Sequence, residues 1–327
     1  MKQNSMRVSM VTTLSLLIWL FQVGFPQTVK VDERIPHYKK TRGISGNANS
    51  IGSDTMNNLM TLWLEGFRKY YPLVNIQIEG KGSSTAPPAL ISGTAQFGPM
   101  SRKMKAKEVD AFEKHYGFKP TTIRTSLDAL AVFVNKDNPL DCLTLEQVDA
   151  VFSKTRKRGY HEVKTWGDLG LTGKWANQPI RIYGRNSASG TYGFFKEHVL
   201  KKGDYKDEVK EQPGSASVVQ SVTEDLYAIG YSGIGYKTSG VKALSLAKKK
   251  GAPCYDGHYE NVISRKYPIS RYLYLNIAKN PNKPLDPMVK EFLKFVLSYE
   301  GQQIVIKDGY LPLPYDVVMK ELAKLDE

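Results

Sequence analysis

The stretch Ile180–Val199, with the sequence IRIYGRNSASGTYGFFKEHV, contains the pattern that decides the fold. Its beginning, Ile180–Tyr183, is mostly apolar and predicts a short strand. A loop of small and polar residues follows, and the apolar positions from Tyr192 onward predict a helix. A strand that leads through a loop into a helix is the building unit of α/β proteins.

The same unit occurs earlier in the chain. Residues Val74–Ile78 predict a strand, Gly80–Thr85 form a loop of small residues, and two prolines suit the first turn of the helix that follows. A third small-residue loop, Gly52–Thr55, precedes a helix whose apolar residues recur every three or four positions as far as Phe67. Three such loops in one chain predict an α/β fold.

The overall composition is that of an ordinary globular protein. The chain has 327 residues, of which 41% are apolar and 24% charged, so wholly disordered, collagen-like and coiled-coil proteins are excluded. Its length suits one or two domains with a buried core. The formal net charge of +14 favours an anionic partner such as a small anion, a nucleic acid or a lipid surface.

The N-terminal segment predicts export from the cytoplasm. Lys2 and Arg7 precede an uncharged, largely apolar run, Val8–Phe25, which is the pattern of a secretory signal peptide. We therefore expect a signal peptide over residues 1–27, and a mature protein in the periplasm or otherwise outside the cytoplasm. An uncleaved membrane anchor is the alternative, although its serines and threonines dilute the run below the length of a stable membrane span.

The two cysteines and five histidines do not form a recognisable metal or catalytic motif. Cys142 and Cys254 are far apart; a disulfide between them is compatible with export, whereas two free buried thiols are the favoured alternative. The chain contains neither a P-loop nor a complete dinucleotide motif, and no basic cluster is interleaved with aromatic residues. We predict a protein that is not an enzyme, with no catalytic residue, no metal site, no cofactor and no nucleic-acid partner.

The small-residue loops favour an anion site. The N-terminus of a helix presents unpaired N–H groups and a partial positive charge, and Ser and Thr add hydroxyl donors. Each loop alone is typical of a helix cap. The second-half loop also contains Arg185, four residues before Ser189, and a guanidinium donates to two oxygens of one oxyanion at once. Together the loops predict a shared site for a small oxyanion.

Several longer motifs occur together with these loops. They are Gly52-Ser53-Asp54-Thr55-Met56, Gly82-Ser83-Ser84, Phe97-Gly98-Pro99-Met100-Ser101-Arg102, Arg185-Asn186-Ser187-Ala188-Ser189-Gly190-Thr191, Ala228-Ile229-Gly230-Tyr231, Glu300-Gly301-Gln302 and Gly309-Tyr310-Leu311-Pro312-Leu313. In this combination the chain resembles the phosphate-binding proteins of bacterial ABC uptake transporters, which are periplasmic solute-binding proteins. The resemblance covers nearly all of the mature chain.

The resemblance implies an α/β, two-lobed periplasmic-binding-protein fold of type II, with two crossing strands as the hinge. We assign residues 1–27 to the signal peptide, 28–133 to the first part of lobe 1, 134–237 to lobe 2 and 238–327 to the returning part of lobe 1. Candidate crossings are Ala129–Asn135 and Ala228–Tyr231. The implied function is capture of one inorganic phosphate ion by a monomer that delivers it to a membrane ABC permease.

The resemblance also implies a set of phosphate-binding residues. These are Ser53, Asp54, Thr55, Ser83, Ser101, Arg185, Ser189, Gly190 and Thr191. Well-known members have an Asp at the position of Ser101, where it accepts a hydrogen bond from the proton on the phosphate. Our hypothesis is that Asp54 takes this role; the alternative role for Asp54 is a helix N-cap. Alternative functions are binding of another tetrahedral oxyanion such as sulfate or molybdate, a secreted phosphatase, and a sensing or adhesion protein.

Overall fold

The computed structural model of the chain describes residues 29–326, so the expected signal peptide lies outside the described residues. The elements are β1 (Gly46–Ile51), η1 (Asp54–Met56), α1 (Asn57–Arg68), β2 (Val74–Glu79), η2 (Ser83–Thr85), α2 (Ala86–Ile91), β3 (Gly98–Met100), α3 (Ala106–Tyr116), β4 (Thr121–Asn135), β5 (Cys142–Thr144), α4 (Leu145–Phe152), η3 (Trp166–Leu169), η4 (Gly173–Trp175), β6 (Arg181–Arg185), α5 (Gly190–His198), β7 (Lys210–Gln212), α6 (Ser215–Glu224), β8 (Ala228–Gly233), η5 (Ile234–Tyr236), β9 (Val241–Ala243), β10 (Ser245–Ala247), α7 (Tyr259–Ile263), β11 (Ser270–Ile277), α8 (Pro287–Val296), α9 (Tyr299–Lys307) and α10 (Tyr315–Asp326). Within the described range, no helix has the length and apolar character needed to cross a membrane.

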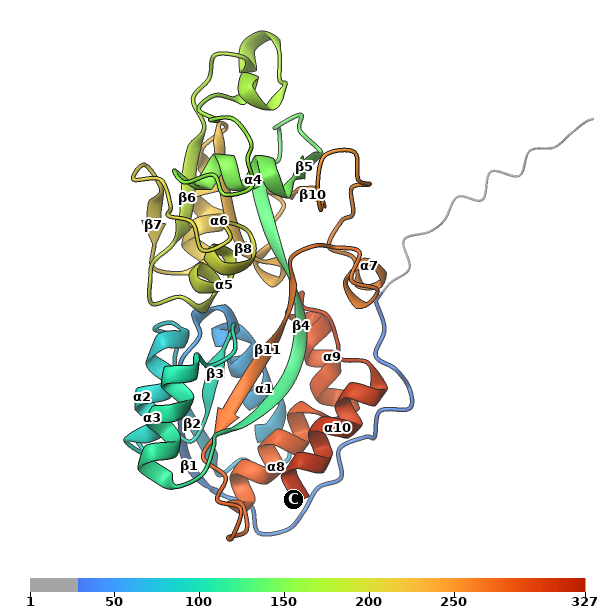
Figure 1. Cartoon of the computed structure of the whole chain (residues 1–327). Coiled ribbons are helices and arrows are strands. Elements are labelled where there is room, and N and C mark those ends of the chain that lie inside the picture. The colour runs from blue at the N-terminus through green and yellow to red at the C-terminus, as the bar shows by residue number, and fades with distance from the viewer. Residues whose placement is uncertain (1–28, 327) are drawn as a thin grey trace, which may run out of the picture.

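The molecule has two lobes, as predicted, and a long strand connects them. Figure 1 shows β1–β3, α1–α3, β11 and α8–α10 in one lobe and α4–α6 with β5–β8 and β10 in the other, while β4 runs from one lobe into the other. We call these the first and second lobes. The largest sheet has the strand order β3-β11-β4-β8-β6-β7, and β9 also pairs with β4. It is therefore a mixed sheet that extends through both lobes.

Strand β4 is continuous, and its two halves have different neighbours. Residues Thr121–Ala129 pair with β11, whereas Leu130–Val134 pair with β8. The expected crossing segment Ala129–Asn135 is the second half of this strand. Because one strand belongs to the sheets of both lobes, we expect any change in lobe orientation to bend or twist β4.

Elements from both ends of the chain pack together in the first lobe. The indole N–H of Trp63 in α1 donates to the carbonyl of Gly301 in α9 at 2.9 Å. The ring of Phe67, one turn further along α1, lies 5.4 Å from that of Phe292 and 5.6 Å from that of Phe295, both in α8. The apolar periodicity of α1 thus buries one face of the helix against the C-terminal helices.

The strand pairing bears on where the chain returns to the first lobe. The expected second crossing, Ala228–Tyr231, lies in β8, which pairs with β4 on one side and β6 on the other. Strand β9 pairs with the far end of β4, and β10 pairs with β5. We propose that the second lobe continues past the expected boundary at residues 237–238 and that the chain returns to the first lobe in the segment that leads into β11 (Ser270–Ile277), which pairs with β3 and the first half of β4.

The two cysteines form a disulfide, so the favoured alternative of two free thiols is wrong. Cys142 and Cys254 are bonded, with their Cα atoms 6.3 Å apart. Cys142 begins β5, and its partner strand β10 is bridged through Leu246 to Tyr255, next to Cys254. The bond therefore ties the segment after β10 to β5 inside the second lobe.

Candidate functional site

The loops that the sequence singled out converge where the two lobes meet. Each follows the carboxyl end of a strand: Ser53–Thr55 follow β1, Ser83 follows β2, Ser101 follows β3 and Ser189–Thr191 follow β6. Strands β1 and β2 are parallel, so their loops leave the same edge of the sheet. In open α/β sheets this edge is where ligands bind.

Loops of the two lobes are in direct contact. Thr55 Oγ1 lies 2.9 Å from Thr191 Oγ1, and the N–H of Ser84 donates to the carbonyl of Ala188 at 3.1 Å. Ser83 Oγ and Ser101 Oγ are 3.3 Å apart at the same contact. The structure therefore has the lobes closed. It brings all nine expected residues together, and eight of them are buried: Ser53, Thr55, Ser83, Ser101, Arg185, Ser189, Gly190 and Thr191.

Two glycines permit this close approach. A β-carbon added to Gly190 would overlap Ser83 Oγ and lie 2.6 Å from Ser101 Oγ. A β-carbon on Gly82, whose φ is +111°, would lie 2.5 Å from the carbonyl oxygen of Ala188. Any larger residue at Gly190 would hold the lobes apart, whereas Gly82 is also required by its backbone conformation.

Arg185 is the buried cation of the site. It is the last residue of β6, and its side chain is 1% exposed. Its Nη1 lies 3.1 Å from Asp54 Oδ2 and donates to Ser215 Oγ at 2.6 Å, while Nη2 donates to the carbonyl of Pro213 at 3.1 Å. The Nε–H is buried without a partner among the described residues. Burial lowers the pKa of Arg185, and the charge of Asp54 opposes that shift. A buried N–H without a partner is costly, so this donor is available to a guest.

Asp54 does cap a helix, but the helix is in the opposite lobe. The residue begins η1, and the cap of η1 is Ser53, whose side chain makes no capping bond. Instead, Asp54 Oδ2 accepts the N–H of Ser215, the first residue of α6, at 2.8 Å. A carboxylate at a helix N-terminus is favourable. The other oxygen, Oδ1, has no hydrogen-bond partner among the described residues, and the side chain is 22% exposed.

Three site hydroxyls each accept from an N–H group. Ser83 Oγ accepts the N–H of Ser101 at 3.0 Å. Ser189 Oγ accepts the N–H groups of Thr191 and Tyr192 at 3.1 and 3.3 Å, as the N-cap of α5. Thr191 Oγ1 accepts Nη2 of Arg271 at 2.9 Å. Because N–H groups only donate, the hydroxyl protons point elsewhere, which makes the wall of the site rich in donors.

Several residues that support these loops were not predicted from the sequence. Tyr236 donates to the carbonyl of Asp54 at 2.9 Å and Tyr310 to that of Thr55 at 2.8 Å. Ser215 carries no sequence signal beyond its position after a Pro-Gly pair. Arg271 and Asp128 had a sequence signal, because each is a charged residue next to a mostly apolar run.

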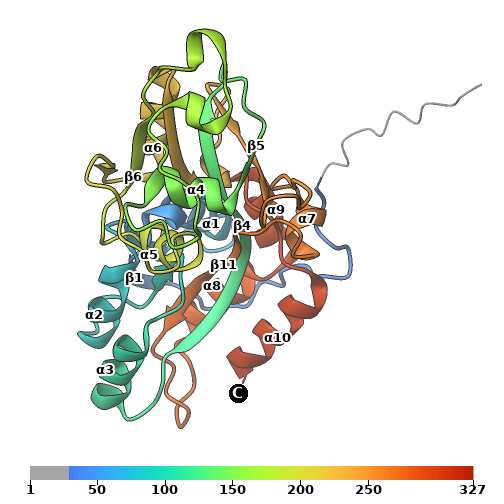
Figure 2. The ribbon, with the colours of Figure 1, turned by 45° about the horizontal axis from the view of Figure 1, so that its top comes forward.

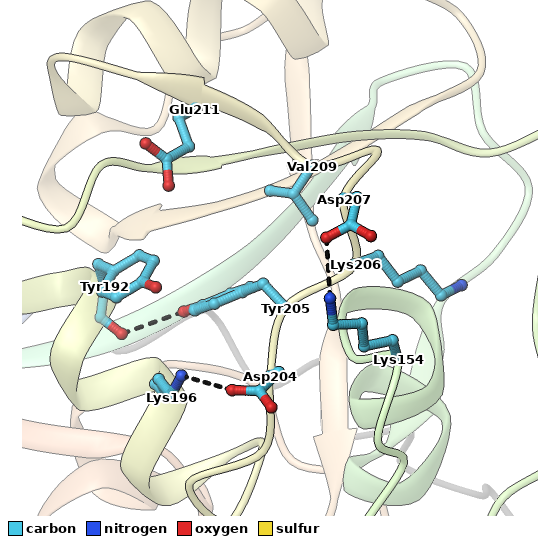
Figure 3. Close-up of a pocket in the computed structure, with 9 residues that line it drawn as sticks. All are labelled: Lys154, Tyr192, Lys196, Asp204, Tyr205, Lys206, Asp207, Val209 and Glu211. Carbon is cyan, nitrogen blue, oxygen red and sulfur yellow. Dashed lines mark hydrogen bonds and ion pairs between the residues drawn. The ribbon is translucent and has the colours of Figure 1, made fainter.

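A hollow on the second lobe lies beside the site but is separate from it. Figure 3 shows this pocket of about 430 Å³, in which Lys154 pairs with Asp207 and Lys196 with Asp204. Its inner wall is Tyr205, whose hydroxyl lies 3.0 Å from that of Tyr231. Burial raises the pKa of both tyrosines, so both hydroxyls keep their protons.

The same tyrosines support the anion site from behind. Tyr231 Oη accepts the backbone N–H of Arg185 at 3.3 Å. The hydroxyl of Tyr205 in turn lies within 3.0 Å of the carbonyl of Tyr192, in the first turn of α5. The wall of the hollow therefore braces both the strand end and the helix that form the second lobe's half of the site.

Comparison with known proteins agrees with this architecture. Two α/β lobes with a donor-lined site between them are typical of solute-binding proteins, and the family model described as "PBP superfamily domain" matches residues 41–300. The chain is 58% identical to "Phosphate-binding protein PstS" of Pseudomonas aeruginosa over 90% of this chain and 92% of that protein. It is 29% identical to the protein of the same name from Staphylococcus saprophyticus, over 86% and 85% of the two chains. The chain therefore belongs to the PstS family of phosphate-binding proteins, as the resemblance indicated.

A solved structure extends the comparison to three dimensions. It is that of a putative phosphate ABC transporter substrate-binding protein from Clostridium perfringens with bound phosphate, with a TM-score of 0.70 and 26% identity. The match covers 82% of this chain and 100% of that one. These relatives carry the names of binding proteins, in agreement with the expectation that the chain is not an enzyme.

Proposed function

We propose that the protein captures inorganic phosphate between its lobes, outside the cytoplasm, and delivers it as a monomer to an ABC permease. One observation carries the proposal: hydroxyl and N–H donors from both lobes, together with the buried Arg185, converge on one place. The names of the relatives, which include a phosphate ABC transporter substrate-binding protein, support the choice of phosphate and of the transporter.

The donor set suits a small tetrahedral oxyanion. Ser83, Ser189 and Thr191 each accept at least one N–H group, so each can donate its own proton to an anion. The unpartnered Nε–H of Arg185 adds a charged donor. Because these donors lie in a buried site, each hydrogen bond to the guest forms with little competition from water.

Asp54 supplies the selectivity for phosphate. Its Oδ2 is engaged by Arg185 and Ser215, which leaves Oδ1 to accept a hydrogen bond from a protonated guest. Phosphate carries a proton near neutral pH and sulfate does not, so sulfate would oppose its lone pairs to those of Oδ1. A site built around a matched hydrogen bond rejects an analogue that lacks the group by roughly 10⁴- to 10⁵-fold.

Binding is expected to close the lobes, because the expected phosphate-binding residues are divided between them. Ser53–Thr55, Ser83 and Ser101 belong to the first lobe, and Arg185 with Ser189–Thr191 belongs to the second. Only the closed protein satisfies the ion from both sides, so binding shifts the balance of open and closed forms. The permease then has a ligand-dependent shape to recognise.

Calorimetric titration of the mature chain, residues 28–327, tests the proposal. We expect binding of orthophosphate and arsenate, which are both protonated, and rejection of sulfate. Tight binding of sulfate or molybdate with no response to phosphate would assign the site to another oxyanion. Release of product from a chromogenic phosphate ester would instead support a phosphatase, which the proposal excludes.

The selectivity role of Asp54 has a separate test. In Asp54→Asn the acceptor is replaced by an amide that also donates, so we expect the ratio of sulfate to phosphate dissociation constants to fall at least about tenfold. Asp207→Asn, on an exposed side chain of the second lobe, is the matched control and should leave the ratio unchanged. An unaltered ratio in Asp54→Asn would move the acceptor role to another group.

A further inference from the structure

A second buried ion pair lies behind the site, on the connecting strand β4 and its first-lobe neighbour β11. Arg271 of β11 and Asp128 of β4 are register partners, directly opposite each other. Nε and Nη2 of Arg271 donate to Asp128 Oδ2 at 2.9 and 2.8 Å, and the side chains are 2% and 0% exposed. Asp128 Oδ1 accepts the N–H of Ile234 at 3.0 Å. The carboxylate is thus held from two sides.

The remaining donors of Arg271 reach both halves of the site. Nη2 donates to Thr191 Oγ1 in α5, and Nη1 donates to the carbonyl of Ser101, each at 2.9 Å. The guanidinium also lies over the ring of Phe194, 5.2 Å from its centre. Thr191 and Phe194 are three residues apart on α5 and so lie on one face of that helix. Arg271 therefore contacts the second lobe at two points.

We propose that Arg271 is a positioning residue for anion capture, which fixes Thr191 as a donor and docks α5 when the lobes close. The inference rests on the proposed function, because it assigns how one part of that site works. A guanidinium has five N–H groups and no acceptor. Arg271 directs one of them at Thr191, so the hydroxyl must accept there and its own proton turns toward Thr55 or a bound anion.

The way Arg271 distributes its N–H groups distinguishes a positioning role from that of a purely structural ion pair. Two N–H groups are sufficient for the bond to Asp128, and Arg271 uses two more on Ser101 and Thr191. Those two partners belong to the expected ligand loops of opposite lobes. Since the contact with Thr191 and Phe194 crosses between lobes, it is made in the closed form, and any loss of it lowers affinity by favouring the open form.

The test is a double-mutant cycle between Arg271 and Thr191, measured by calorimetry with orthophosphate. Lysine keeps the charge next to Asp128 but lacks the planar fork that reaches several acceptors. We expect Arg271→Lys to weaken phosphate binding about 10- to 100-fold, the range for one charge-assisted hydrogen bond. In the Thr191→Val background the same change should cost less than about threefold, because the acceptor is already absent.

Thr191→Ser is the matched control, since serine retains the hydroxyl. In that background Arg271→Lys should again weaken binding about 10- to 100-fold. A purely structural role would lower affinity equally in the valine and serine backgrounds, and this outcome would overturn the inference. So would an Arg271→Lys protein that binds phosphate as tightly as the wild type.

A second variant keeps the test decisive if Arg271→Lys does not fold. The double change Asp128→Asn with Arg271→Gln leaves no unpaired buried charge and should show the same loss of affinity. Wild-type affinity in that variant would count against the inference. The wild-type titration separates the two proposals: absence of phosphate binding there contradicts the proposed function itself, whereas wild-type binding with an unaffected Arg271 variant contradicts the positioning role alone.

Discussion

Two buried arginine–aspartate pairs meet at the same loops and are built differently. Arg185 and Asp54 come from opposite lobes, with a contact at 3.1 Å, and Asp54 is 22% exposed. Arg271 and Asp128 lie opposite each other on paired strands, with two bonds to one oxygen and almost no exposure. Within residues 29–326, Nε of Arg185 and Oδ1 of Asp54 in the first pair have no hydrogen-bond partner, while both oxygens of Asp128 have partners.

The difference indicates which pair exchanges partners during function. A pair that crosses between lobes breaks when the lobes open, and its unused groups are available to a guest. A cross-strand pair with every oxygen satisfied is part of the frame. The four formal charges cancel, so N–H groups, hydroxyls and helix dipoles provide most of the attraction for the anion. The net charge of +14 then acts on recruitment at long range.

The largest expected effect concerns the cross-strand pair of Arg271 and Asp128. Asp128→Ala leaves Arg271 charged and buried without its partner, which should lower the free energy of unfolding by about 3–5 kcal/mol. Urea denaturation of the phosphate-free protein measures it. Asp54→Ala is the matched comparison and should cost less than about 1 kcal/mol, because Asp54 is partly exposed and regains water when the lobes open. Equal losses in the two variants would remove the distinction between the pairs.

The next effect concerns the pair of Arg185 and Asp54, which crosses between the lobes. Arg185→Met removes the charged donor from the site and should weaken phosphate binding about 10- to 150-fold, as for the loss of a hydrogen bond to a charged group. Calorimetry gives the affinity, and urea denaturation gives the stability. If Arg185→Met retained wild-type affinity, the cation of the site would have to be Arg271 instead.

The smallest effect concerns the contact between the lobes at Gly190 and Ser83. The pair of Arg185 and Asp54 forms only when the lobes are in contact. A β-carbon in Gly190→Ala would overlap Ser83 Oγ, and overpacking of this kind costs about 1–3 kcal/mol, so phosphate affinity should fall roughly 5- to 150-fold. Gly193→Ala, one turn away, is the matched control, because its β-carbon would meet Arg102 only at 3.6 Å. Equal affinities for the two alanine variants would show that closure tolerates the added carbon.

The parts of the site that were predictable are those with a local signal. Small-residue loops before helices identified the regions of Ser53, Ser83 and Ser189, because such a pattern is visible within about ten residues. The family resemblance added Ser101, which has no such pattern of its own. The pairing of Arg271 with Asp128 was not predictable, since it depends on the register between strands 143 residues apart.

Contacts between residues far apart in the sequence also explain why the structure differs from the predictions for Asp54 and for the two cysteines. Asp54 suggested an N-cap of its own helix, but it caps α6, whose start is 161 residues further along the chain. The disulfide could not be assigned because Cys142 and Cys254 are 112 residues apart and only the pairing of β5 with β10 brings them together. The fold shows the same dependence: in Figure 2 the N-terminal helix α1 and the C-terminal helices α8–α10 belong to one lobe, and β4 leads from that lobe into the other.

A crystal structure of the mature protein with orthophosphate tests the central claim most directly. We predict one ion between the lobes, within hydrogen-bond distance of Ser83, Ser189 and Arg185, with one of its oxygens facing Oδ1 of Asp54. An ion bound to one lobe only, or at a place that none of these side chains reaches, would contradict the account.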